Sequence, residues 1–115
     1  MIKTRTLDAI TILDLQGPLI AGSDDAALRK AIRTAFDSGS TTVILNMQEV
    51  PAIDSSGVAA LASGHMTAMN RQGRLKLSNL TQKLKDVFII MRLHTVFDSY
   101  DSEADAIASV GGQRT

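Results

Sequence analysis

Apolar and polar positions alternate along several short stretches of the chain, a period of two that is typical of β-strands. Residues 2–6 and 9–16 show this alternation weakly and predict two strands near the N-terminus. The apolar run Val-Ile-Leu at 43–45 predicts a strand that is covered on both faces. Residues 74–78 predict a fourth strand, and residues 96–100 predict a short strand or extended segment.

Between these strands, apolar residues recur every three or four positions, which predicts helices with one buried face. The first helix is expected to begin at a capping Ser23 and to end near Asp37, where Ser-Gly-Ser at 38–40 breaks the pattern. Its predicted core stripe consists of Leu28, Ile32, Ala35 and Phe36.

The second helix is expected from Ser55 to about Gln72, with Gly73 as its C-terminal stop. The face predicted to enter the core consists of Val58, Leu61, Ala62, His65 and Met69. Small side chains crowd the first turns of this helix, namely Gly57, Ala59, Ala60, Ala62, Ser63 and Gly64. They permit tight packing against the sheet or the close approach of a partner, and the residues alone leave both readings open.

Two further helices complete the predicted order. Thr81 is expected to cap the third, and Ser102 to begin the fourth, which ends at Gly111. The apolar face predicted for the third helix consists of Leu84, Val87, Phe88 and Met91. At least two of the methionines Met66, Met69 and Met91 are expected to fill the core. Strands that alternate with helices predict an α/β fold with one sheet, covered by about four helices mainly on one side.

Composition narrows the function classes. With 115 residues, 44% of them hydrophobic, the chain is expected to form one domain over residues 1–115. Its 12 basic side chains balance 12 acidic ones, so no net field favours nucleic acid or an anionic membrane. The absence of cysteine excludes disulfides, thiolate chemistry and Cys-ligated metals, and no cofactor is expected. No window approaches the ~20 apolar residues of a membrane span, and no secretion signal opens the chain, so a cytoplasmic protein is expected.

The candidate chemistry lies where the central strand leads into the second helix. Pro51 ends the strand pattern, and Asp-Ser-Ser-Gly at 54–57 opens the helix. A helix start carries unpaired N–H groups and about half a unit of positive charge, so a hydroxyl there can carry a phosphate. The simpler reading is that Ser55 and Ser56 only cap the helix.

The chain resembles STAS domains, in particular the bacterial anti-sigma factor antagonists. The resemblance rests on Val-Ile-Leu-Asn at 43–46 and Ile-Asp-Ser-Ser-Gly-Val at 53–58. It extends to Gly17, to the strand that follows Gly73 and to the segment 93–97, and so covers nearly the whole chain. It implies the STAS fold, a mixed sheet of four or five strands with strand 43–46 at its centre.

The resemblance also implies a function. In this family an anti-sigma factor, itself a serine kinase, phosphorylates the first serine after the motif aspartate, here Ser55. The unmodified chain is expected to bind that kinase and so release a sigma factor. The phosphorylated chain is expected to release the kinase. The implied partner-binding residues are Asp54, Ser55, Ser56, Gly57 and Val58. Asp54 is expected either to cap the helix or to orient Ser55 and help bind the kinase's magnesium. A phosphatase is a second candidate partner, and the chain is expected to be a monomer or weak dimer.

Other classes compete with this reading. A non-catalytic STAS scaffold, or a subunit of a signalling or lipid-transport complex, would use the two serines as an unregulated contact. A serine hydrolase would need a base and an oxyanion hole, but the chain has only His65 and His94 and no Gly-x-Ser-x-Gly motif. His65 is read as a packing residue rather than a base. A Gly-x-x-x-x-Gly-Lys nucleotide loop is also missing, so we do not expect an enzyme.

Overall fold

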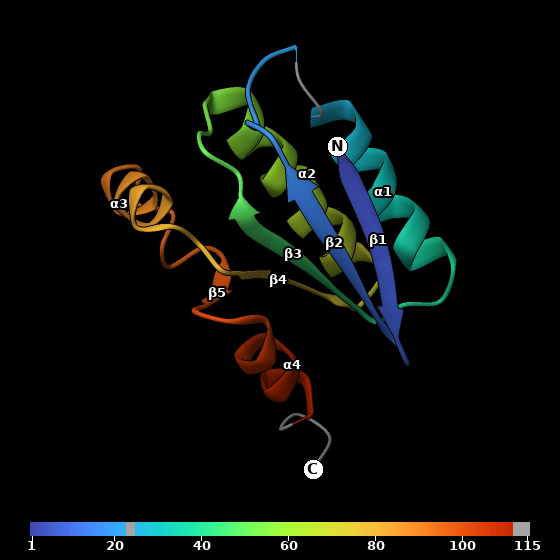
Figure 1. Cartoon of the computed structure of the whole chain (residues 1–115). Helices are drawn as coiled ribbons and strands as arrows, with labels where there is room; N and C mark the ends of the chain where they lie inside the picture. Colours follow the sequence, from blue (N-terminus) through green and yellow to red (C-terminus); the bar gives the residue numbers. More distant parts are fainter. Residues whose placement is uncertain (23–24, 112–115) are drawn as a thin grey trace.

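The chain forms five strands and four helices within residues 1–22 and 25–111, the part that this computed structural model describes (Figure 1). The strands are β1 (Ile2–Leu7), β2 (Ile10–Gln16), β3 (Thr42–Glu49), β4 (Arg74–Ser78) and β5 (Asp98–Tyr100). The helices are α1 (Asp25–Asp37), α2 (Ser55–Asn70), α3 (Gln82–Ile90) and α4 (Glu103–Gly111). Each predicted element is therefore present, and only the proposed cap Ser23 lies outside the described residues.

The strands form one mixed sheet in sequential order, β1-β2-β3-β4-β5. β1 and β2 make an antiparallel hairpin, which turns at Asp8 with a φ of 54°. From β2 to β5 every neighbouring pair is parallel. β3 lies at the centre of the sheet, as predicted, and its residues Val43, Ile44 and Leu45 are fully buried because both faces of the sheet are covered there.

Three helices share one face of the sheet, and this follows from the strand order. Each connects a strand to its next parallel neighbour in the same direction, and right-handed crossovers then place all three on the same side. Side chains from α1, α2 and α3 join one core with the sheet, including Leu13, Leu28, Ile32, Val43, Leu45, Leu61, Leu77, Leu84 and Phe88. α4 packs on the opposite face, so the prediction of helices mainly on one side is confirmed with one exception (Figure 1).

The contact of α4 with the sheet is small and is reinforced by charge. Ala106 packs there with three isoleucines of the strands, Ile10, Ile12 and Ile44. At the first turn of α4, Arg5 of β1 bonds Glu103 at 2.5 Å and also Asp14 of β2 at 2.6 Å. The bond from Arg5 to Asp14, together with a bond from Asn46, holds the pKa of Asp14 below its usual range. The Arg5 side chain is 47% exposed, so the pairs orient α4 more than they stabilise it.

The buried face of α2 differs from the predicted one. Leu61 is buried as predicted, but Ala62 and Met69 are exposed. The residues that face inward are mostly small: Gly57, Ala60, Leu61, Gly64 and Ala68. A Cβ on Gly64 would lie only 2.6 Å from Cδ1 of Ile32, which shows how closely α2 approaches α1. The prediction was wrong because periodicity favours large side chains, whereas two closely packed helices bury small ones.

The methionines were also predicted wrongly. Met66, Met69 and Met91 are 57%, 60% and 42% exposed, so none of them fills the core. Met91 is the C-cap of α3 and not part of its buried face. Exposed methionine side chains are typical of contact surfaces, because the flexible thioether adapts to the shape of a partner.

Gly73 has a packing role instead of the predicted conformational one. Gln72, not Gly73, takes the left-handed conformation after α2, with a φ of 57°. A Cβ on Gly73 would lie 2.7 Å from the ring of Phe36 and 2.8 Å from the carbonyl oxygen of Thr41. The glycine therefore lets the chain enter β4 directly against α1 and the neighbouring loop.

Candidate functional site

Two loops lie side by side at the carboxyl ends of β2 and β3. Because these strands are parallel, the chain leaves both at the same edge of the sheet, where α/β folds gather functional loops. The Leu19 N–H donates to the Ala52 carbonyl at 3.0 Å, and the Asp54 N–H donates to the Leu19 carbonyl at 3.1 Å. Leu19 also pairs with Ile53 in an isolated parallel bridge. The loop after β2 therefore holds the segment that leads into α2.

Asp54 is the N-cap of α2, and its carboxylate ties the helix to the neighbouring loop. One oxygen, Oδ1, accepts the N–H groups of Ser56 at 2.8 Å and Gly57 at 3.1 Å. The other, Oδ2, accepts the N–H of Ala21 at 3.0 Å. These bonds, that of Ala21 first, lower the pKa of Asp54, so the cap is ionised at neutral pH. The capping role considered for Asp54 is present, and Ser55 and Ser56 are not caps but the first two residues of the helix.

Gly57 makes this arrangement possible. A Cβ at this position would lie 2.2 Å from the Leu19 carbonyl oxygen and 2.6 Å from Cγ1 of Ile53. No side chain fits there without moving the backbone. Sequence reasoning missed this contact with Leu19. A glycine inside a helix costs about 1 kcal/mol relative to alanine, and that cost was a signal that close packing required it.

Ser55 is the accessible member of the motif. It is exposed, and its hydroxyl has no hydrogen-bond partner within the described part of the chain. Ala59 and Ala62, one and two turns further along α2, are exposed as well. A smooth surface of small side chains therefore extends along the helix from Ser55. The small residues thus divide, since Gly57, Ala60 and Gly64 pack inward while these alanines face outward.

The other predicted residues lie around Ser55 at different depths. Asp54, Ser56 and Val58 are half-buried, and Gly57 is buried. The structure therefore brings the segment 54–58 together at one helix end, with the Ser55 side chain outermost.

The surroundings of Ser55 offer little for catalysis. His65 lies ten residues further along α2, about 15 Å along the helix axis. Its half-buried ring meets the ring of Phe97 edge-on at a centroid distance of 6.0 Å, in line with its predicted packing role. Within residues 1–22 and 25–111, no three His, Asp or Glu side chains are grouped to hold a metal ion. None of the helices described is long and apolar enough to cross a membrane.

The family model of the STAS domain matches residues 1–106, and the chain belongs to this family. A search of curated proteins finds no match. The mixed five-stranded sheet with β3 at its centre agrees with the fold that the sequence resemblance implied.

Several solved structures share the fold. The Thermotoga maritima protein TM1081, assigned as an anti-sigma factor antagonist, is 18% identical with a TM-score of 0.86, and the match covers 95% of this chain and 93% of TM1081. The antagonist SpoIIAA in its unphosphorylated form is 25% identical with a TM-score of 0.73, and the match covers 97% of this chain and 99% of SpoIIAA. SpoIIAA of Bacillus in its phosphorylated form is 25% identical with a TM-score of 0.70, and the match covers 96% of this chain and 99% of SpoIIAA. A sulfate transporter family protein of Wolinella succinogenes is 22% identical with a TM-score of 0.78, covering 91% and 87%.

Proposed function

We propose that this STAS domain is an anti-sigma factor antagonist whose binding is switched off by phosphorylation of Ser55. The observation that carries the proposal is the exposed Ser55 hydroxyl at the first residue of α2, next to a fixed cap and a smooth helix surface. The likeness to SpoIIAA, an antagonist solved with and without phosphate, supports it. The expected partner is an anti-sigma factor with serine kinase activity, and a phosphatase would restore the hydroxyl. Such a protein acts in the cytoplasm.

The proposed binding surface is the outer side of the first turns of α2. Ser55 and the exposed alanines after it let a partner approach the helix closely. Asp54, Ser56 and Val58 border this surface and are half-buried. Gly57 is buried against Leu19, so its part in binding is to hold the helix start in place from beneath.

A phosphate on Ser55 would act on the partner and not on the fold. It adds roughly −1.5 to −2 charges at pH 7. The N–H groups of Ser56 and Gly57, which could otherwise receive it, already bond the Asp54 carboxylate. The phosphate would therefore stay at the surface beside an ionised aspartate. Pressed into an interface without a matching cation, it would cost a few kcal/mol, or roughly 100-fold in affinity.

The alternative is a STAS scaffold or transport-complex subunit that uses the same surface without regulation. Both functions need the exposed start of α2, so a contact there does not distinguish them. Only the switch requires that a charge on Ser55 abolishes binding while the fold survives.

Binding of Ser55 variants to an anti-sigma factor, measured by calorimetry, tests the proposal. Ser55→Ala should bind as tightly as the unphosphorylated chain, and Ser55→Asp should bind roughly 10- to 100-fold more weakly. Ser99→Asp places the same charge on an exposed serine of β5 and should change nothing. All three variants should keep the melting temperature of the wild type. Equal binding by Ser55→Ala and Ser55→Asp would contradict the switch.

A further inference from the structure

β1 forms an exposed edge of the sheet. It pairs with β2 over its whole length, from Ile2 to Leu7, and within the described residues no strand lies on its other side (Figure 1). Every residue of β1 after Ile2 is exposed. The strand has six residues, no proline and no break in its register, so it lacks the short length, proline or bulge that often blocks pairing at an edge. The edge can therefore accept a further strand.

The pairing of β1 with β2 shows which backbone groups face outward. Met1 and Gln16 exchange two bonds, from nitrogen to oxygen in each direction and both at 2.8 Å. Such doubly bonded pairs recur at every second residue of an antiparallel ladder, so Lys3 and Arg5 bond β2 in the same way. The N–H and C=O groups of Thr4, which lies between them, then point away from β2. The same alternation turns the groups of the residues two before and two after Thr4 outward.

A cavity of about 350 Å³ lies beside this edge, between β1 and the end of α1. Six of its ten lining residues carry a hydroxyl group: Thr4, Thr6 and Thr11 from the strands, Thr34 from α1, and Ser38 and Ser40 from the turn after it. The hydroxyls of Thr4, Thr6 and Thr34 have no hydrogen-bond partner in the described part of the chain. The cavity therefore suits a small side chain that can form hydrogen bonds.

An added strand would meet different surroundings on its two faces. Side chains of a strand alternate between the faces of the sheet, so Thr4 and Thr6 lie on the side of α1. Lys3 and Arg5 lie on the side of α4, where Arg5 bonds Glu103. A strand paired with β1 would place every second side chain at the cavity and the others opposite Lys3 and Arg5.

The charges of the edge select the kind of strand. Lys3 is exposed and makes no ion pair or hydrogen bond within residues 1–22 and 25–111. The neighbouring carboxylates, Asp14 and Glu103, already bond Arg5. A second copy of the chain, added antiparallel about a two-fold axis, would set Lys3 or Arg5 against Lys3 or Arg5 of the partner subunit in every register that pairs most of β1. Facing like charges destabilise a sheet, whereas an acidic side chain opposite Lys3 stabilises it.

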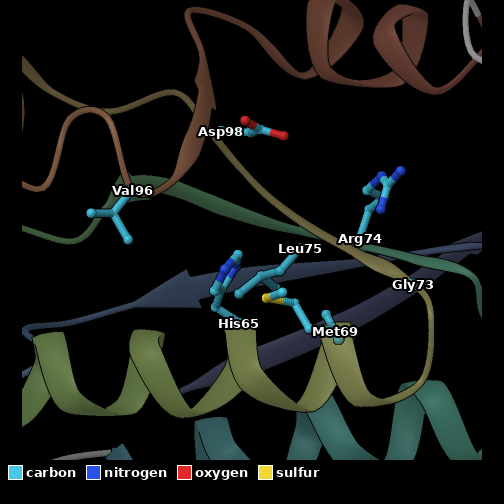
Figure 2. A pocket seen from close by; sticks show the side chains of 8 residues that line it. His65, Met69, Gly73, Arg74, Leu75, Val96 and Asp98 are labelled. Atoms are coloured by element: carbon cyan, nitrogen blue, oxygen red, sulfur yellow. The ribbon is translucent and has the colours of Figure 1, made fainter.

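The opposite edge of the sheet lacks these features. β5 has only three residues, and the carboxylate of its first residue, Asp98, lies 3.6 Å from the buried ammonium group of Lys76. A cavity of about 440 Å³ at that edge is lined by His65 and Met69 of α2 and by Asp98 (Figure 2). It borders a helix and a very short strand, so it offers no long row of free backbone groups to an extended segment.

We propose that the edge of β1 binds an extended, acidic segment of another protein as an antiparallel strand. The outward backbone groups of Thr4 and its alternate neighbours would bond the segment, with an acidic side chain opposite Lys3 and a serine or threonine in the cavity. Ser40, at the cavity, precedes β3, whereas Ser55 follows the end of that strand, about 26 Å further along. The site is therefore separate from the surface proposed for the switch.

An NMR titration of the isotope-labelled chain with a synthetic peptide tests the proposal. The probe is a capped heptapeptide of alternating threonine and glutamate, which presents the same two faces in every register. We expect saturable binding with a dissociation constant below ~1 mM, and slower hydrogen exchange at the Thr4 and Thr6 amides. The amides of Lys3 and Arg5, already bonded to β2, should not change. Binding that does not saturate, or no protection of Thr4 and Thr6, would overturn the proposal.

Modified peptides test each part of the contact without changing the protein. N-methylation of two interior threonines blocks nitrogens that would face β1 and should abolish binding, whereas N-methylation of two glutamates should not. Lysine in place of glutamate should weaken binding at least ~10-fold. Valine in place of threonine keeps the shape, removes the hydroxyls and should weaken binding about 5-fold. Equal binding within any of these comparisons would contradict the proposal.

Two lysine variants complete the test. Lys3→Gln should weaken binding of the glutamate peptide about 3-fold, the usual effect of one exposed ion pair, and Lys30→Gln on the exposed side of α1 should have no effect. Protection of the Thr4 amide that rises with the concentration of the chain, without peptide, would show that a second copy occupies the edge and would overturn the proposal. No anti-sigma factor is present in these measurements, so their failure would leave the proposed switch standing.

Discussion

The two ends of α2 differ in the contacts that hold them and in the side chains that they expose. At its start, one carboxylate accepts two backbone N–H groups from the first turn of α2 and one from the loop after β2, and a glycine allows the Leu19 carbonyl to approach. At its far end, Met66 and Met69 extend into solvent beside a cavity. The start is therefore held by backbone contacts and exposes only small groups, whereas the end exposes large flexible ones.

This difference indicates what each end can do. A residue that serves as a switch has to stay in one place while its charge changes, and Asp54 and Gly57 hold Ser55 in that way. A surface that adapts to a partner gains from flexible side chains, as at Met66 and Met69. Changes at the start should therefore affect folding or regulated binding strongly, whereas changes at the exposed positions of the far end should affect both much less.

The largest expected effect is the loss of stability in Gly57→Ala. The new Cβ would lie 2.2 Å from a backbone oxygen, which cannot move without shifting the loop after β2. We expect a loss of about 3 kcal/mol or more in the free energy of unfolding, measured with a chemical denaturant. A loss below that of Gly64→Ala would show that the start of α2 is not held as described.

The second effect concerns charge at the two ends and binding to an anti-sigma factor. Ser55→Asp should lower the affinity roughly 10- to 100-fold, for the reason given for the phosphate. Met69→Glu adds a negative charge at the far end, on a side chain that is 60% exposed, and should leave this affinity unchanged. Titration of both variants against the same partner by calorimetry checks the contrast. A comparable loss in both would mean that the partner covers the whole helix.

A smaller effect is expected for Gly64→Ala, in the middle of α2. Its Cβ would meet Cδ1 of Ile32 at 2.6 Å, the far end of a flexible side chain that can rotate away. The helix also gains about 1 kcal/mol of propensity, which offsets part of the strain. We expect a net loss of about 1 kcal/mol by the same denaturation assay. A stabilised variant would show that α1 and α2 pack less closely than the structure indicates.

The smallest effect is the acid dependence that Asp54 gives to stability. The pKa of Asp54 is lowered in the folded chain, so the stabilisation is complete above the unfolded value of about 3.9. It is lost as the pH falls through the lower folded value. Asp54→Asn keeps a capping oxygen but does not titrate, so its stability should fall less between pH 5 and pH 2, as followed by thermal unfolding. Identical acid profiles would mean that the carboxylate is not bonded to the helix and to the loop after β2 as described.

The sequence predicted the fold because its signals are local and strong. The apolar run 43–45 marks the central strand, and the alternation of strands and helices predicts one sheet with helices packed on it. It did not predict the inner face of α2, where small residues displace large ones. Nor did it predict the contact between Gly57 and Leu19, which are far apart in the chain and meet only when two loops become neighbours. Ser55 could be singled out as a candidate because its motif is local, but its exposure depends on Asp54 taking the capping position.

Mass spectrometry can decide whether Ser55 is a phosphorylation switch. The chain and its Ser55→Ala variant would be incubated with ATP and an anti-sigma factor serine kinase from the same organism, followed by intact-mass measurement and peptide mapping. We expect one phosphate on the wild type, located at Ser55, none on the variant, and release of the modified chain from the kinase. A phosphate at another residue, or a stable complex without any modification, would contradict it.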